Sequence, residues 1–228
     1  MSIQTIINKS TAMQVNRRKM VGIQYTRNEI PRISETPTTN PWRFTMTMPN
    51  SLRYNDARTI IETLDTLDRK APETITFGAL PNMSWIFSYQ GGAALSQLAN
   101  IRVVSFIGNQ LILTALPPVN ATRVMFAPND LIQIGNYPYP FTSTSEVQRG
   151  ITDTITITTH RPNILSNSVA GLGITVGAAC QFRVFCPNMP VYKLFPGGAT
   201  YNIDGSLSNN AYIEWSDDFQ LYEYVGTA

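Results

Sequence analysis

The clearest pattern of apolar and polar positions in the chain lies between residues 42 and 77. Apolar and polar side chains alternate from Trp42 to Met48, which is the period of a half-buried strand. After this run, apolar residues recur every three or four positions, which predicts an amphipathic helix over about 55–70. Its apolar stripe consists of Ala57, Ile60, Ile61, Leu64 and Leu67. Because Glu73 to Phe77 is again typical of a strand, we expect a hairpin of two strands closed around one helix.

The segments before this unit are less regular. Residues 3–7 and 20–25 are rich in β-prone side chains and predict strands. Residues 28–41 are rich in Pro, Thr and Ser, and Pro31 and Pro37 keep this segment out of any helix. Two interpretations stay open for it: an extended arm that lies on a neighbouring subunit, or a surface loop.

The rest of the chain predicts short strands separated by turns. Ile101 to Phe106 and Gln110 to Leu113 flank Gly108-Asn109, which indicates a tight hairpin, and a short helix is expected at 93–99. Residues 165–178 predict a loop with little core of its own. Further strands are expected at 123–126, 131–134, 151–160, 181–185, 191–195, 211–215 and 219–225. This spacing favours a sandwich or barrel.

The sequence therefore predicts a mainly β chain, a β-sandwich or split barrel with one flanking helix at about 55–70 and a second β-rich part. Pro117-Pro118 is the first candidate boundary. It would divide the chain into domains 1–118 and 119–228, unless the two parts form one continuous domain.

Composition and charge exclude several classes of partner. Of the 228 residues, 43% are hydrophobic and only 14% are charged, against about a quarter in an average protein. A net charge of +2 argues against nucleic acid as a specific partner. No apolar run approaches the roughly 20 residues that span a bilayer, and the first residues do not form a signal peptide. We expect a chain made in a cytoplasm.

Signatures of catalysis or metal binding are weak. His160 is the single histidine, and we expect it to cap the end of a strand by hydrogen bonding rather than to act as a base. Cys180 and Cys186 are expected to be free thiols, because six residues of strand separate them by roughly 20 Å. We therefore predict no enzyme activity and no cofactor.

Two further groups of residues are candidate sites. Four carboxylates near the C-terminus could be read as a glycosidase pair or a calcium site, but carboxylates in a turn before a C-terminal strand are commonplace: Asp204, Glu214, Asp217 and Asp218. Tyr137 and Tyr139 lie in a stretch interrupted by prolines and predict exposed aromatic contacts. Trp42 and Trp85 lie on apolar strand faces, where core packing is the ordinary outcome.

The order of elements, together with one stretch of the second half, resembles a known family. A strand, a helix and a strand precede a β-rich part that contains Asn129-Asp130-Leu131-Ile132-Gln133 and Tyr137-Pro138-Tyr139-Pro140. This arrangement resembles minor tail or baseplate proteins of tailed bacteriophages, and is most similar to the distal-tail and tail-tube-like group.

The resemblance implies a structural subunit with no catalytic residues. Strands 42–48 and 73–77 would continue a sheet across subunits into a ring of six or three copies, and the arm at 28–41 would reach an adjacent protomer. Neighbours would be tube, hub or tape-measure proteins, in a virion tail assembled in the host cytoplasm. The expected interface residues are Pro31, Pro37, Trp42, Phe44, Tyr137 and Tyr139.

Two alternatives stay open. A jelly-roll capsid subunit would also be β-rich and nearly neutral, although the helix between two strands and the lack of a basic arm count against it. A carbohydrate-binding module would use the loop of Tyr137 and Tyr139 as its platform.

Overall fold

The computed structural model of the chain describes residues 3–17, 21–25, 31–35, 41–49, 52–66, 71–78, 84–165, 168–196 and 211–225. The chain is mainly β, with 40% of its residues in strands and 14% in helices, as the sequence predicts. None of the described helices is long and apolar enough to cross a membrane.

The chain folds into two compact units, and both are discontinuous in sequence. Unit 1 contains residues 1–16, 41–75 and 183–224, and unit 2 contains residues 17–40, 76–182 and 225–228. This division differs from the predicted boundary at Pro117-Pro118. The reason is that C-terminal strands pair with N-terminal ones, so a unit is not one stretch of sequence.

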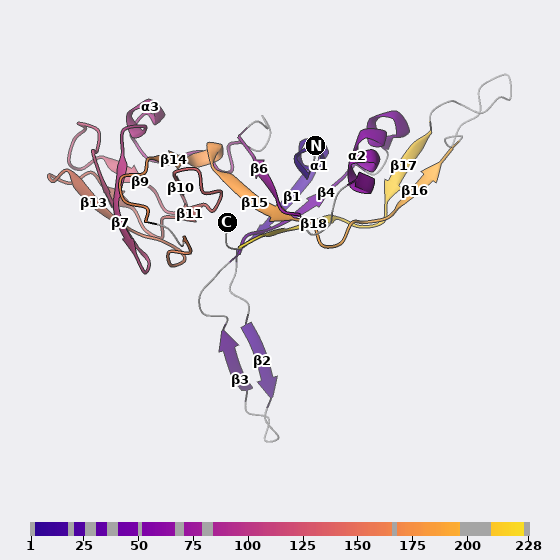
Figure 1. The fold of residues 1–228 in the computed structure, drawn as a ribbon, viewed down its shortest axis with the longest axis horizontal. Helices are drawn as coiled ribbons and strands as arrows, with labels where there is room; N and C mark the ends of the chain where they lie inside the picture. The colour runs from indigo at the N-terminus through magenta and orange to yellow at the C-terminus, as the bar shows by residue number, and fades with distance from the viewer. Residues whose placement is uncertain are drawn as a thin grey trace. The chain divides into compact units, whose positions relative to one another are not determined.

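The largest described sheet belongs mainly to unit 1 and has the strand order β1-β4-β18-β15-β6 (Figure 1). Its strands are β1 (Ala12–Asn16), β4 (Arg43–Thr47), β18 (Phe219–Glu223), β15 (Gln181–Phe185) and β6 (Glu73–Thr76). The predicted strands at 42–48 and 73–77 are thus confirmed, but their pairing as a hairpin is wrong. Two strands, β18 and β15, lie between β4 and β6.

One face of this five-stranded sheet is apolar because β4 and β18 place their apolar positions in register. Leu221 lies opposite Phe44 and Phe219 opposite Met46, and all four side chains are buried. Helix α1 (Ile3–Lys9) buries Ile3, Ile6 and Ile7. The predicted strand at 3–7 is therefore wrong. Its apolar residues have the spacing of a helix face, which the β-prone composition concealed.

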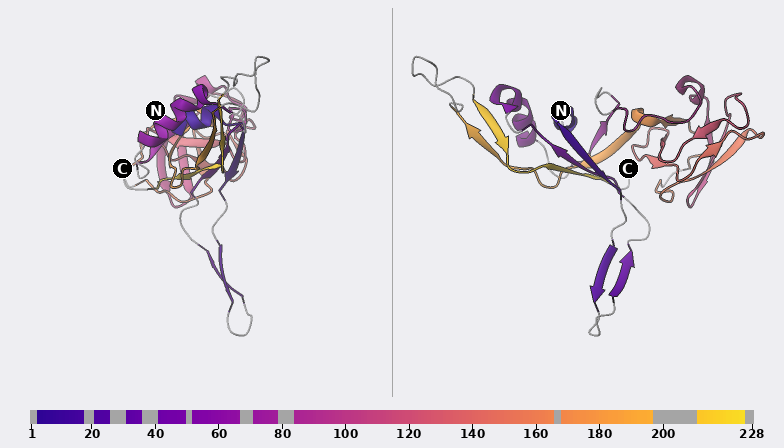
Figure 2. Two further views of the ribbon diagram at one scale, coloured as in Figure 1. Left: turned by 90° about the vertical axis from the view of Figure 1, so that its right-hand side faces the viewer. Right: turned by 180° about the vertical axis from the view of Figure 1, so that it is seen from behind.

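A second sheet of unit 1 has three strands in the order β16-β17-β5. They are β16 (Tyr192–Phe195), β17 (Tyr212–Trp215) and β5 (Leu52–Arg53). Helix α2 (Tyr54–Thr66) follows β5 directly and confirms the predicted helix. Its Ala57 and Ile61 pack against Ile213 of β17, and Figure 2 shows α2 beside β17.

Residues 76–182 of unit 2 contain three small described sheets and a short helix, α3 (Leu95–Leu98). The sheets are β13-β8-β7 (Thr154–Thr158, Gln110–Thr114, Arg102–Ile107), β11-β10-β14 (Phe141–Thr142, Leu131–Ile134, Ile174–Val176) and β12-β9 (Val147–Gln148, Val124–Phe126). The hairpin of β7 and β8 turns at Gly108, whose φ of +54° suits glycine. It confirms the predicted hairpin.

The segment at 165–178 differs from its prediction as a loop without core. It contains β14, which is followed by a 3₁₀ turn at Gly177–Ala179. Val169, Ile174 and Val176 are buried in the core of unit 2. The Gly, Ser and Asn residues around them concealed a three-residue strand, which is too short to show a period.

Strands β2 (Val21–Tyr25) and β3 (Pro31–Glu35) pair antiparallel with each other, from Val21 opposite Glu35 to Tyr25 opposite Pro31. The predicted strand at 20–25 is confirmed. Part of the predicted arm at 28–41 is β3, and the rest of the arm lies almost entirely outside the described residues. Its contact with a neighbouring subunit stays a prediction.

Candidate assembly interface

Two of the expected interface residues lie in the core of unit 1. Trp42 is 3% exposed and Phe44 is 1% exposed, and their rings stack with centroids 6.1 Å apart. The backbone around Trp42 is held by Glu223: its carboxylate accepts the Trp42 N–H at 3.0 Å, and its own backbone N–H donates to the Trp42 carbonyl. These positions correct the assignment of Trp42 and Phe44 to a contact between subunits. Trp85, for which core packing was also expected, is instead 68% exposed.

The stretch with Tyr137 and Tyr139 does not present two exposed rings. Tyr139 is 5% exposed and Tyr137 is half-buried. Two backbone hydrogen bonds, from Tyr137 to Ile134 and from Tyr139 to Tyr137, fold the stretch back on itself. The prediction of exposed contacts is therefore wrong for Tyr139. Of the arm prolines, Pro31 begins β3 and Pro37 lies outside the described residues.

The two edges of the five-stranded sheet are β1 and β6 in the described part of the chain. Strand β4, expected to border a neighbour, is an interior strand, whereas β6 does lie at an edge. On β1, Val15 lies opposite Phe44 and so faces the apolar side of the sheet, yet it is 39% exposed. An apolar face that continues to an open edge is the geometry at which sheets extend between chains.

A third open edge is β16, which pairs only with β17 among the described strands. We call this feature the β16 edge; it comprises Val191, Tyr192, Lys193 and Leu194. Val191 is 72%, Leu194 46% and Tyr192 40% exposed. Such a concentration of apolar side chains on an edge strand is unusual for a monomer in water.

A cavity of about 560 Å³ adjoins the start of β16. Its lining comprises Thr45, Asn188, Met189, Pro190, Val191, Ser216, Asp217, Asp218 and Gln220. No lysine or arginine is among these residues, so the two exposed carboxylates of Asp217 and Asp218 set the charge of the cavity. Glu214 is exposed on β17, and Asp204 lies outside the described residues. The described residues contain no cluster of three or more His, Cys, Asp or Glu that could hold a metal.

His160 has the hydrogen-bonding role expected from the sequence. Its Nδ1 accepts the N–H of Thr142 at 2.9 Å, and its backbone N–H donates to the Thr142 carbonyl at 3.0 Å. Burial, reinforced by the charges of Arg161 and Arg17, lowers the pKa of His160 to about 3. A base with that pKa is a poor proton acceptor at neutral pH, since catalytic bases titrate near the operating pH.

The two cysteines are buried thiols that form no disulfide, as expected. Burial raises the pKa of the Cys180 thiol to about 12, which keeps it protonated. Its Sγ donates to the Thr175 carbonyl at 3.3 Å. A buried thiol of this kind is a packing residue rather than a nucleophile.

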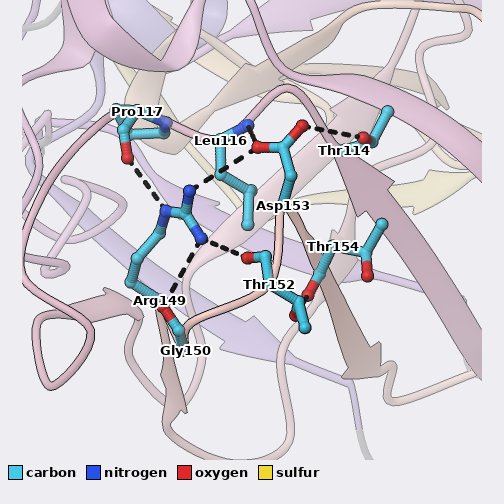
Figure 3. Close-up of polar contacts among 8 residues, drawn as sticks. All are labelled: Thr114, Leu116, Pro117, Arg149, Gly150, Thr152, Asp153 and Thr154. Carbon is cyan, nitrogen blue, oxygen red and sulfur yellow. Dashed lines mark hydrogen bonds and ion pairs between the residues drawn. The ribbon is translucent and has the colours of Figure 1, made fainter.

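A dense polar cluster of unit 2 holds two loops together (Figure 3). The Arg149 guanidinium donates to the carbonyls of Pro117 at 2.9 Å and of Thr152, and it lies 3.5 Å from the Asp153 carboxylate. Asp153 in turn accepts the Leu116 N–H at 3.1 Å. Because Arg149 is engaged by backbone carbonyls, the cluster is structural.

Asp130 was not singled out as a site by sequence reasoning, although it is a buried carboxylate. It is 2% exposed and accepts the backbone N–H groups of Gln90 and Ala127, each at 2.8 Å. Burial raises its pKa, and these hydrogen bonds oppose the rise. Pro128-Asn129-Asp130 is a sequence typical of a turn, but no local pattern indicates the distant partner Gln90.

No family model matches the chain, and neither does any curated protein. The sheet edges β1, β6 and β16 are the described features at which a strand of another chain could pair. They are therefore the candidate functional site.

Proposed function

We propose that the chain is a structural subunit of a bacteriophage tail or baseplate, and that copies join into a ring through the edges of the five-stranded sheet. In this ring, β1 of one copy pairs with β6 of the next. The observation that carries the proposal is the five-stranded sheet, whose two unlike edges pair with no further described strand and whose apolar face reaches β1 at Val15.

Unlike edges favour a ring over a simple dimer. Pairing β1 with β6 is a head-to-tail contact, and a constant rotation between copies closes such contacts into a cyclic assembly. The low charge content of 14% also fits a chain whose surface is covered by copies, because interface cores are depleted of charged residues.

The assignment to a phage tail rests on the resemblance of the element order to the distal-tail and tail-tube-like group. The ring of six or three copies would stack against tube, hub or tape-measure proteins in the virion. The two alternatives have less support. The strand orders of the described sheets do not include the paired four-stranded sheets of a jelly roll. A carbohydrate-binding module would need both tyrosine rings at the surface, and Tyr139 is buried.

The test is the mass of the purified chain, by light scattering and negative-stain images, for the native sequence and two edge variants. Val15→Lys points a charge into the apolar side of β1, and Thr74→Lys adds a charge to β6. We expect rings from the native chain and monomers from each variant alone. A mixture of the two variants should form a dimer, because one intact β1 and one intact β6 remain.

Ile151→Lys is the matched control, because Ile151 is 94% exposed and lies in unit 2. It should leave the rings intact. A native chain that is monomeric at all concentrations, or rings that survive Val15→Lys, would overturn the proposed contact.

A further inference from the structure

The β16 edge differs from the edges of the five-stranded sheet in its exposed apolar content. Tyr192 lies opposite Trp215, and Leu194 lies opposite Ile213. The side chains of Tyr192 and Leu194 are therefore on the same face of the sheet as Ile213, which α2 covers. Ile213 is fully buried, whereas Leu194 is 46% exposed. Among the described residues, the apolar layer beneath α2 therefore continues one strand beyond the part that α2 covers.

One more strand beside β16 would complete that layer. It would pair with β16 on the side that no other described strand occupies, and it would cover Tyr192 and Leu194 with its own alternate side chains. Pro190 and Pro196 bracket the run from Val191 to Phe195, which limits the added pairing to a short extended segment.

The charge at one end of β16 indicates which segment fits. The Ser216 N–H donates to the Val191 carbonyl at 2.9 Å, which joins the start of β16 to the turn carrying Asp217 and Asp218. The cavity of about 560 Å³ opens there, with these two carboxylates and no cation in its lining. A lysine or arginine side chain complements it.

We propose that the β16 edge binds an extended segment of a second protein, whose apolar residues cover Tyr192 and Leu194 and whose lysine or arginine enters the cavity at Asp217 and Asp218. The inference rests on the proposed function in one respect: a ring closed through β1 and β6 does not use β16. The proposed partner is a different component, and a contact between copies at β16 is an outcome that would overturn this.

The test uses the full chain and a short acetylated peptide in which valine and threonine alternate, with a lysine at each end. A peptide with glutamate in place of both lysines is the control probe. We expect the lysine peptide to bind, measured by fluorescence anisotropy, and to protect the backbone amides of 191–195 from hydrogen exchange. The double variant D217N/D218N should weaken binding about fivefold to tenfold, in keeping with the small contribution of exposed ion pairs.

Leu194→Lys should abolish binding, because it removes apolar area and repels the probe. Its matched control is Val104→Lys, since Val104 is 44% exposed on β7 of unit 2. If Leu194→Lys does not fold, the exposed Asp217 and Asp218 variants still decide the outcome.

Three results would overturn the inference: equal binding of the glutamate peptide, binding without protection of 191–195, or loss of the rings in Leu194→Lys. The last would show that β16 is a contact between copies. Failure of the ring proposal is read separately, from Val15→Lys and Thr74→Lys, which leave the β16 edge unchanged.

Discussion

His160 couples the stability of unit 2 to pH. The folded chain lowers the pKa of this imidazole to about 3, chiefly through burial, whereas the unfolded chain protonates it near 6.5. Above about pH 6.5 the histidine is neutral in both states and does not change the free energy of unfolding with pH. Between about pH 6.5 and 3 it should lower that free energy by about 1.4 kcal/mol for each pH unit, because the unfolded chain then binds a proton that the folded chain does not. Urea unfolding at a series of pH values measures this slope.

The control for this prediction is His160→Gln, which keeps an acceptor for the Thr142 N–H and has no titrating group. In this variant the free energy of unfolding should change less with pH over the same range, because the contribution of the histidine is absent. Equal slopes in the two proteins would show that the acid sensitivity has another source.

Burial of individual residues was only partly predictable, because it depends on neighbours that are distant in the chain. Alternation around Phe44 identified the buried face of its strand correctly. The same sequence could not show that Tyr139 is buried, since its prolines are equally compatible with a loop that projects and one that folds back. Side chains on regular elements were therefore predicted better than those in irregular stretches.

At the scale of elements, local pattern and long-range pairing differ in how much the sequence shows. The helix after β5 and the hairpin at Gly108 have clear local signals, and both are present. The place of β4 between β1 and β18 depends on a strand that begins at Phe219, far along the chain. Sheet edges follow from such pairing, so the candidate site could not be located without the structure.

Arg149 provides a prediction for the loop that follows β8 and the loop between β12 and β13, which it joins. Arg149→Met should destabilise unit 2 by about 2 kcal/mol, because the Thr152 carbonyl loses the Arg149 donor and the Pro117 carbonyl keeps only the Val119 N–H. Asp153→Asn should cost far less, since Asp153 is 64% exposed and the asparagine keeps an acceptor for Leu116. Thermal unfolding of both variants tests the order, and equal losses would contradict it.

At the scale of the molecule, most of unit 2 is one insertion in the sequence of unit 1. Residues 76–182 run without interruption between β6 and β15, and they contain the whole apolar cluster from Ala93 to Val176. The ends of this stretch lie together, since the rings of Phe77 and Phe182 have centroids 5.7 Å apart. A domain that has its own hydrophobic core, and whose two ends lie close together, can be inserted into the sequence of another domain.

A fragment of residues 76–182 should therefore fold alone. We expect cooperative urea unfolding and a dispersed amide NMR spectrum, with a modest loss of stability because Arg17 no longer donates to Thr142. A fragment that ends at Pro117 should not fold, because it lacks β13, the partner of β8. If the first fragment is disordered, the insertion depends on unit 1 for its stability.

Ionic strength should separate the two proposed contacts of the whole assembly. The contact of β1 with β6 relies on backbone pairing and on apolar residues such as Val15, so salt should change the ring mass little between about 0.05 M and about 0.5 M. The lysine peptide at Asp217 and Asp218 relies in part on exposed charges, so its affinity should fall several-fold over the same range. Light scattering and anisotropy on one dilution series measure both. A ring that dissociates in salt while the peptide stays bound would reverse the assignment, because it would place the electrostatic contact between copies and the apolar one at β16.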